Sequence, residues 1–311
     1  MELRYSIDNI TWVAHDVPLN KFAEYKHFIF NNFDYEPYEV EESNYMLTLF
    51  KKIKVEETTT EVDEDGEVIL KEGYFRERQF HLQYISGKSI VRMEYNPNVI
   101  SKTLVNFIEH GFSKELFPVR HMSRIDIALD VFGRDLTYLF LDRPRVKSTR
   151  ICGINNSLEN TYYGMRKSDL FIRIYNKAVE RRQKFLQGKA YEDFSDDIYH
   201  LARKHWWRIE MQVRTRAIND CFSLFEEMLD QMRFLIDENL EDKDIGVIMK
   251  VIALRDNPWL FGRMSKSTKS EYRKLLKENF SEDELKEKAK KLLREETALF
   301  DYYFALYPMK D

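Results

Sequence analysis

The sequence predicts an α+β fold, in which a curved, largely antiparallel sheet carries helices on its outer face and is followed by a C-terminal helical module. Three observations predict this fold. Several segments alternate apolar and polar residues with a period of two. The element order β-α-β-β-β-β-α occurs twice, although the letters themselves show no repeat. Beyond residue 240, apolar residues follow a helical spacing throughout.

The first predicted half covers residues 1–115. A strand over 3–16 ends before Pro18, and the apolar spacing that follows predicts a helix over 19–32. The turns at Asp65-Gly66 and at Ser86-Gly87-Lys88 separate further segments rich in β-forming residues. These segments predict strands at 45–55, 67–71, 76–85 and 88–95, and an amphipathic helix is expected at 98–112.

The second half, residues 116–240, repeats this order with an insertion. The strongly alternating segment 121–132 predicts its first strand, and 135–142 predicts its helix. The remaining elements are strands expected at 146–154, 160–166, 169–177 and 206–214 and a helix at 217–238. The insertion, 178–205, has the pattern of two helices joined near Gly188. We therefore expect one domain over 1–240, and a helical module over 241–311 with helices at 243–255, 267–279 and 282–307.

Composition and charge limit the kinds of partner. The formal net charge of −4 argues against general coating of nucleic acid, whereas residues 143–216 hold 17 Lys and Arg against 8 Asp and Glu. This basic segment predicts an anionic partner held at one place or, alternatively, a set of solvated helix faces. Cys152 and Cys221 lack a metal-type spacing. No signal peptide or membrane span is expected, so the sequence predicts a cytoplasmic protein without a membrane partner.

Polar residues gather on one predicted face of the sheet. Along 123–131, 170–177 and 207–214, apolar side chains alternate with charged ones, which gives each strand an apolar face for helices and an opposite polar face. If these strands are neighbours, Asp126, Tyr175 and Glu210 converge. The alternative is a face that simply contacts water, which is common in antiparallel sheets.

The converging residues suit phosphoryl transfer. Carboxylates form a hard oxygen site for Mg²⁺ or Mn²⁺, which stabilises charge on phosphodiester oxygens. The candidate ligands are Asp126, Glu210, Asp130 and Glu94. A tyrosine hydroxyl is a weak nucleophile with a pKa of about 10, and we expect Arg173, Lys177 and the metal to favour the Tyr175 phenolate. The absence of GxxxxGK, HExxH and His-x-His motifs argues against nucleotide hydrolysis and common zinc chemistry.

Two sequence blocks resemble the core signature of the Rep_trans family, the initiators of staphylococcal-type rolling-circle plasmids. They are Thr161-Tyr-Tyr-Gly-Met-Arg-Lys-Ser168 and Leu170-Phe-Ile-Arg-Ile-Tyr-Asn-Lys177, followed by Glu180. The segments Ser123-Arg-Ile-Asp-Ile-Ala-Leu-Asp130 and Trp207-Arg-Ile-Glu210 resemble further family blocks, and the resemblance covers roughly residues 1–270 in order and spacing.

The resemblance implies a nicking-closing enzyme. Such proteins bind a plasmid's double-strand origin, nick one strand at an extruded hairpin of supercoiled DNA, and form a 5′-phosphotyrosine through the tyrosine that corresponds to Tyr175. The strand is rejoined at termination. The resemblance also implies a homodimer and a host PcrA-type helicase as partners. In this interpretation residues 1–240 form the catalytic domain, and 241–311 recognise the origin or form the dimer.

Several residues are expected to contact DNA. Arg173 or Lys177 is expected to stabilise the transferring phosphate, and Arg166 or Arg208 to hold the flanking backbone. The basic C-terminal patch is expected at the origin through Arg263, Lys266, Lys269, Arg273 and Lys274. That patch is equally compatible with a solvated amphipathic helix. Of Trp206 and Trp207, one is expected in the core and the other to stack on an unpaired base, and Tyr162 and Tyr163 are expected in the core or as stacking residues.

Two other functions remain open at this point. A sequence-specific DNA-binding protein without catalysis would use the sheet as a platform, and Tyr175 would then be dispensable. A relaxase of a conjugative element or a phage-type initiator would keep the chemistry in another genetic context.

Overall fold

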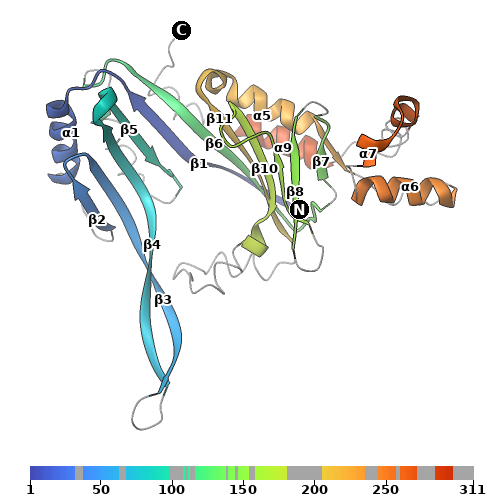
Figure 1. Ribbon diagram of the computed structural model, residues 1–311, viewed down its shortest axis with the longest axis horizontal. Coiled ribbons are helices and arrows are strands. Elements are labelled where there is room, and N and C mark those ends of the chain that lie inside the picture. Colours follow the sequence, from blue (N-terminus) through green and yellow to red (C-terminus); the bar gives the residue numbers. More distant parts are fainter. Residues whose placement is uncertain are drawn as a thin grey trace. The chain divides into compact units, whose positions relative to one another are not determined.

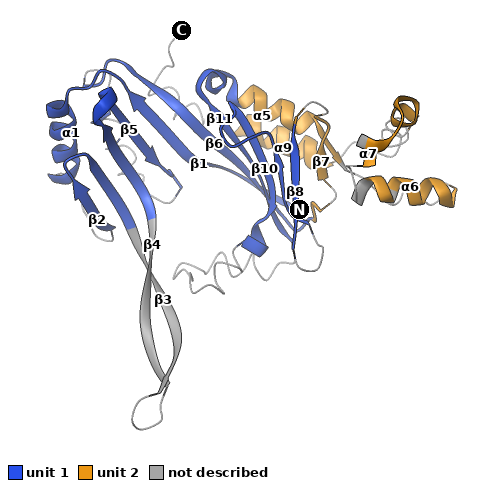
Figure 2. Cartoon of the chain, viewed as in Figure 1, with its two compact units in different colours: residues 1–134, 147–221, 298–311 blue, residues 135–146, 222–297 orange. Residues whose placement is uncertain are grey.

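The computed structural model describes most of the chain as two compact units (Figure 1, Figure 2). The described residues are 1–31, 38–62, 68–98, 108, 111–112, 116–137, 139–143, 146–153, 158–180, 205–234, 244–256, 260–271 and 284–296. Among these, unit 1 takes residues within 1–134 and 147–221, and unit 2 takes residues within 135–146 and 222–297. These boundaries differ from the expected division at residue 240, and the functional roles assigned to the two predicted domains stay predictions.

Ten described strands of unit 1 form one sheet in which all neighbouring strands are antiparallel. The order is β2-β3-β4-β5-β1-β6-β11-β10-β9-β8. The strands are β1 Glu2–Ala14, β2 Tyr38–Ser43, β3 Met46–Val62, β4 Val68–Ile85, β5 Ile90–Tyr95, β6 Arg120–Phe132, β8 Ser148–Cys152, β9 Leu158–Tyr163, β10 Leu170–Asn176 and β11 Trp206–Arg214. The sheet curves across its width (Figure 1), so the predicted α+β class with a curved antiparallel sheet is confirmed.

The strand order is the same in the two halves when it is followed outward from the centre. β1 and β6, the first strands of the two halves, pair with each other along their length. Outward from each of them, the four later strands of the same half follow in reverse sequence order. The predicted duplication is therefore confirmed for the strands, although no sequence repeat accompanies it.

Helix α1, Leu19–Asn31, covers the apolar face of the first half. The ring of Phe22 lies 5.3 Å from that of Tyr84, measured between centroids, and the hydroxyl of Tyr25 lies 3.7 Å from the sulfur of Met93. Met93 alternates along β5 with the polar residue Glu94, and successive strand residues point to opposite faces. Helix α1 therefore packs on the face opposite to the polar one.

Two differences from the predicted strands concern the first half. The strand β2 was not expected, because half of its sequence YEVEES is glutamate and only half of its residues are even partly buried. Its position at the edge of the sheet explains this composition, since charged edge strands resist pairing with other chains. The segments 67–71 and 76–85 belong to one continuous strand, β4, so the half still has five strands.

The predicted helix over 135–142 is wrong. Leu139–Leu141 forms a short strand, β7, which pairs with β12, Met232–Phe234, in a separate two-stranded sheet of unit 2. The predicted helix over 217–238 is also too long. The chain there forms a 3₁₀ turn, η2 Thr215–Asp220, then helix α5, Cys221–Asp230, and then β12. Pairing between segments more than 90 residues apart overrides the local helical pattern in both places.

The rest of unit 2 is helical. Helices α6 Ile245–Asp256, α7 Leu260–Arg263 and α9 Glu284–Glu295 fall within the ranges predicted for the C-terminal part or beside them. Ion pairs from Lys290 to Asp230 and from Arg294 to Glu226 join α9 to α5. The predicted helices over 98–112 and 178–205 lie mostly outside the described residues, as do 272–279 and the end of 282–307. The described start of the predicted helix 267–279, residues 267–271, is helical. None of the described helices is long and apolar enough to cross a membrane.

Candidate active site

The strands that carry the predicted site residues are neighbours in the sheet. β11 lies between β6 and β10, and the register places Glu210 opposite both Ala128 and Arg173. On β6, Asp126 lies two residues from Ala128, the residue opposite Glu210, and therefore points to the same face; its own partner on β11 is Gln212. Asp126, Tyr175 and Glu210 therefore share one face, as the alternating pattern predicted. Glu210 lies between the other two, and Asp126 is two strands from Tyr175 and four residues further along.

This region is not a solvated sheet surface. The exposed fraction is 2% for Asp126, 5% for Glu210 and 6% for both Tyr175 and Lys177. Charged residues are rarely buried to this extent without paired partners. The alternative of a face that only contacts water is therefore wrong at the centre of the second half.

The Tyr175 hydroxyl lies between the carboxylate of Glu210 and the ammonium group of Lys177. It donates a hydrogen bond to Oε2 of Glu210 at 3.4 Å and accepts one from Nζ of Lys177, also at 3.4 Å. The guanidinium of Arg173 lies 5.2 Å from the centre of the Tyr175 ring. Both bonds are long, but the geometry gives the hydroxyl proton a carboxylate acceptor.

Burial raises the pKa of Tyr175 well above its ordinary value, and the negative charges of Glu210 and Glu180 add to this effect against the lowering by Arg208 and Arg173. The expectation that Arg173 and Lys177 favour the phenolate is thus not met by these residues alone. The cause is that a buried phenolate loses its hydration. The tyrosine is neutral in this state, so a reaction through it needs a group that takes the proton.

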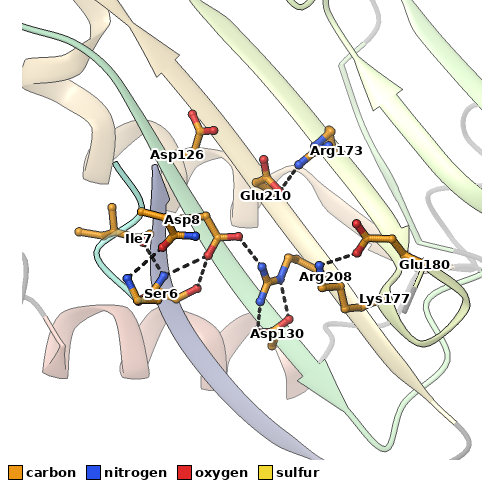
Figure 3. Close-up of polar contacts among 12 residues, drawn as sticks. Ser6, Ile7, Asp8, Asp126, Asp130, Arg173, Lys177, Glu180, Arg208 and Glu210 are labelled. Carbon is orange, nitrogen blue, oxygen red and sulfur yellow. Dashed lines mark hydrogen bonds and ion pairs between the residues drawn. The ribbon is translucent and has the colours of Figure 1, made fainter. Parts of the chain in front are cut away.

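The two cations beside Tyr175 are each held by a carboxylate. Arg173 pairs with Glu210, and Lys177 pairs with Glu180 (Figure 3). Asn176 ends the strand and accepts a hydrogen bond from the amide of Val179 at 3.0 Å, which caps the helical turn 177–180. This turn places Glu180 one turn after Lys177, so the lysine points at the Tyr175 hydroxyl rather than away along the strand.

Asp126 is a buried carboxylate whose negative charge is only partly offset by its ion pair. It pairs with Arg124, its neighbour on the same face of β6. Burial nevertheless raises the pKa of Asp126 to about 6, and the charge of Glu210 raises it further, against the lowering by Arg124. A negative charge at this position is therefore costly without a further cation.

Asp130 belongs to a different network. Both of its oxygens accept hydrogen bonds from Arg208, at 2.7 and 2.6 Å, and the indole N–H of Trp206 donates to it at 3.0 Å. Arg208 also pairs with Asp8 of β1 (Figure 3). Asp130 is fully buried and Arg208 nearly so, which indicates that this group ties β1, β6 and β11 together.

The remaining predicted ligand, Glu94, lies in the first half. It accepts hydrogen bonds from Asn9 at 3.0 Å and Arg92 at 2.8 Å, and it is separated from β6 by the whole of β1. Glu94 is thus a strand away from the other carboxylates. Asp130 is as near to Glu210 in register as Asp126 is, but both of its oxygens are bound by Arg208. Among the described residues, no three of the His, Cys, Asp and Glu side chains converge as a metal site.

Two carboxylates still fit a divalent ion of the expected kind. Mg²⁺ is commonly held by one or two protein carboxylates, with water and substrate phosphates completing its shell. Burial raises the pKa of Asp126 and the charge of Glu210 raises it further, so a bound divalent ion would stabilise the ionised form of Asp126. Asp126 and Glu210 are therefore the residues that would hold Mg²⁺ or Mn²⁺.

The residues predicted to contact DNA differ in what the structure allows. Arg166 is exposed in the turn between β9 and β10, and Arg263, Lys266 and Lys269 lie in unit 2 with exposed or partly exposed side chains. Arg208 is committed to Asp130 and Asp8, so it is not free to hold a DNA backbone. Arg273 and Lys274 lie outside the described residues.

The aromatic predictions are partly corrected. Trp206 and Trp207 are each 1% exposed, so neither can stack on a base. Tyr163 is in the core, whereas Tyr162 is partly exposed and stacks on Phe171 with 5.8 Å between ring centroids. The expected core role holds for Tyr163, and a stacking role remains open for Tyr162.

Sequence reasoning missed Glu180, Asp8 and Arg124 as members of these networks. Glu180 had a local signal, because it follows Lys177 at the spacing of a helical ion pair. Arg124 is likewise two residues from Asp126 on the same face. Asp8 had no signal, because its contact to Arg208 joins residues 200 positions apart.

Known proteins similar to this chain were found among curated sequences and among solved structures. No model of a known protein family matches the chain. Two curated proteins from Staphylococcus aureus, each named Replication initiation protein, are 29% identical to it over 209 and 192 residues, which is 66% and 60% of this chain. The matched regions are 60% and 54% of those relatives, so the chain spans less than two thirds of the proteins that it matches.

A solved structure of a rolling circle replication initiator protein from Geobacillus stearothermophilus is also similar. The TM-score is 0.38 and the identity 14%, over 78% of this chain and 90% of that chain. Membership of the Rep_trans family stays a prediction.

Proposed function

We propose that this chain is a rolling-circle replication initiator that nicks one strand of origin DNA through Tyr175 and later rejoins it. The observation that carries the proposal is the Tyr175 hydroxyl, which contacts Glu210 and Lys177 at 3.4 Å on the face that also holds Asp126. The similarity to staphylococcal proteins named Replication initiation protein supports the biological setting.

In the proposed reaction, Glu210 acts as the general base. It takes the hydroxyl proton of Tyr175 as the phenolic oxygen attacks the phosphorus of the scissile phosphodiester. The bond between phosphorus and the 3′ oxygen breaks, and Lys177 supplies a proton to that oxygen. The products are a 5′-phosphotyrosine and a free 3′-hydroxyl, and the reverse attack by a 3′-hydroxyl rejoins the strand without ATP.

The raised pKa of Tyr175 makes the base necessary, because few phenolates exist before the attack. Arg173 holds Glu210 in place and has a third of its side chain exposed, so it can also contact a non-bridging phosphate oxygen. Asp126 and Glu210 would hold Mg²⁺ or Mn²⁺, and such an ion supplies charge neutralisation at the phosphate. We also propose that the protein uses Mg²⁺ or Mn²⁺, binds origin DNA as a homodimer and acts with a PcrA-type helicase of the host.

The test is a nicking assay on a supercoiled plasmid that carries the origin of the parent element, with Mg²⁺ or Mn²⁺ present. Wild-type protein should convert the supercoiled form to open circles, and Tyr175→Phe should not, while both proteins bind the origin equally. Tyr45→Phe is the matched control, because Tyr45 is exposed in the turn between β2 and β3. Nicking by Tyr175→Phe at the wild-type rate would refute the role of Tyr175. Binding without nicking by the wild type, under both metals, would favour a non-catalytic DNA-binding protein.

A further inference from the structure

A row of polar side chains crosses four strands at one end of the polar face. From β5 to β11 the register places Glu94 opposite Thr11, Thr11 opposite Arg124, and Arg124 opposite Arg214. Opposite residues of an antiparallel pair have Cβ atoms about 5 Å apart. Arg92 lies two positions from Glu94 on β5 and therefore points to the same face.

The three arginines of this group have more donors than the described residues satisfy. Arg92 pairs with Glu94, and Arg124 pairs with Asp126. The side chain of Arg214 makes no hydrogen bond or ion pair with any residue that the structure describes, and its Nε is buried without an acceptor. The Nε of Arg92 is buried without an acceptor as well. Buried donors without partners are costly, so the protein's own hydrogen bonds do not stabilise this group of arginines fully.

The positive charges also repel one another. Burial lowers the pKa of Arg214, the charge of Arg124 lowers it further, and Arg92 adds to the effect. The carboxylates of Asp126 and Glu94 oppose this shift without cancelling it. The side chains stay open to ligands, with 41% of Arg92 and 23% of Arg124 exposed. An anion bound here would relieve the repulsion and occupy the free donors.

The group lies on the same face as Tyr175. Tyr175 is opposite Arg208, six residues before Arg214 on β11, which corresponds to about 20 Å along the strand at 3.3 Å per residue. Between the two, the face carries Gln212 and Phe171 and then Glu210 and Arg173, and Tyr162 stacks on Phe171. A partly exposed aromatic ring between two charged positions suits an unpaired base, because bases stack on aromatic side chains.

We propose that Arg92, Arg124 and Arg214 bind backbone phosphates of a single DNA strand that crosses the sheet toward Tyr175. The proposal rests on the proposed function for the identity of the strand, but not for the charge of the site. The exposed N–H groups of the guanidiniums contact non-bridging phosphate oxygens through charge-assisted hydrogen bonds. Contacts of this kind position the strand and carry no sequence information.

The test is fluorescence anisotropy with a fluorescein-labelled oligothymidylate of 20 nucleotides, and with a duplex of the same length, at several salt concentrations. Arg214→Gln and Arg92→Gln should each weaken binding of the single strand several-fold. Each should also reduce the slope of log affinity against log salt by about 0.7, the value for one phosphate contact on a single strand. Arg124 is left in place because it holds Asp126. Lys21→Gln, an exposed charge on α1 behind the opposite face, is the matched control and should bind as the wild type does.

The outcomes separate this proposal from the proposed function. Wild-type protein that nicks DNA, together with arginine variants that bind with unchanged affinity and slope, would overturn the phosphate site alone. Loss of duplex binding with full retention of single-strand binding would overturn the choice of a single strand. Wild-type protein that neither binds nor nicks any DNA would refute both. Arg214→Lys keeps the charge and should recover most of the salt slope, which excludes misfolding as the cause of the loss.

Discussion

Replacing Asp126 by asparagine should stabilise unit 1 at alkaline pH. Asp126 is 2% exposed, and burial raises its pKa from an ordinary 3.8 to about 6. Because the folded-state pKa is raised, the stabilisation by the protonated form is complete below pH 3.8 and is lost as the pH rises through 6. Above that range the wild type holds a poorly compensated charge. The shift of about two pKa units corresponds to about 3 kcal/mol at 1.36 kcal/mol per unit.

The neutral Asp126→Asn side chain avoids this cost. Its free energy of unfolding should exceed that of the wild type by about 3 kcal/mol at pH 8 and by about half as much at pH 5. Urea denaturation followed by tryptophan fluorescence measures this in a Trp259→Phe background, where the remaining tryptophans, Trp12, Trp206 and Trp207, all lie in unit 1. Glu24→Gln, at an exposed carboxylate of α1, should show no such pH dependence.

The reasoning is refuted if Asp126→Asn is less stable than the wild type at pH 8, or if the difference does not change with pH. The same proteins test the metal. Mg²⁺ at ten times its dissociation constant should stabilise the wild type by about 1.4 kcal/mol and leave Asp126→Asn nearly unchanged. Equal stabilisation of both proteins would place the ion elsewhere.

Three further substitutions test separate parts of the structure. Asp130→Ala should cost about 3–5 kcal/mol in urea denaturation, because it leaves Arg208 buried without its main partner; a loss below about 1 kcal/mol would contradict the importance of that network. Gly164→Ala should destabilise unit 1 more than Gly133→Ala does. Both glycines have positive φ, 85° and 78°, but only at Gly164 would a Cβ meet the carbonyl oxygen of Leu170 at 2.8 Å. Equal thermal shifts for the two would show that the contact relaxes freely. Lys177→Met should slow single-turnover nicking by roughly 10²–10⁴ with origin binding retained, as expected for loss of a proton donor; an unchanged rate would remove Lys177 from the mechanism.

The sequence predicted the parts of the fold that depend on local alternation. The strand β11 was predicted with both of its ends correct, and the faces of β6 and β10 were assigned correctly, because strand residues alternate with a strict period. The predicted convergence of Asp126, Tyr175 and Glu210 needed one further assumption, that these strands are neighbours. They are neighbours, and Tyr175 contacts Glu210, whereas Asp126 lies opposite a residue four positions further along β11 than the partner of Tyr175.

The failures have physical causes that a single sequence does not reveal. The strand β7 is stabilised by pairing with β12, which is distant in the chain, so its local helical pattern was misleading. Arg208 was predicted to contact DNA. The alternation of residues along a strand shows which face of the sheet a side chain is on, but it does not show which residue that side chain contacts. The partners of Arg208, Asp130 and Asp8, are set by strand order and by a register shift in β1 beside Asp8. The arginine row of β5, β6 and β11 depends on the order of four strands and was missed for the same reason.

The central claim is that Tyr175 becomes covalently attached to DNA. Its most direct test is mass spectrometry of the protein after reaction with a supercoiled plasmid carrying the origin, followed by nuclease and trypsin digestion. Cleavage after Arg173 and Lys177 gives the peptide Ile174–Lys177, in which Tyr175 is the only tyrosine. The account predicts a nucleotide linked through its 5′ phosphate on this peptide, and none with Tyr175→Phe. A nucleotide adduct on any other residue, or nicked DNA without an adduct, would contradict it.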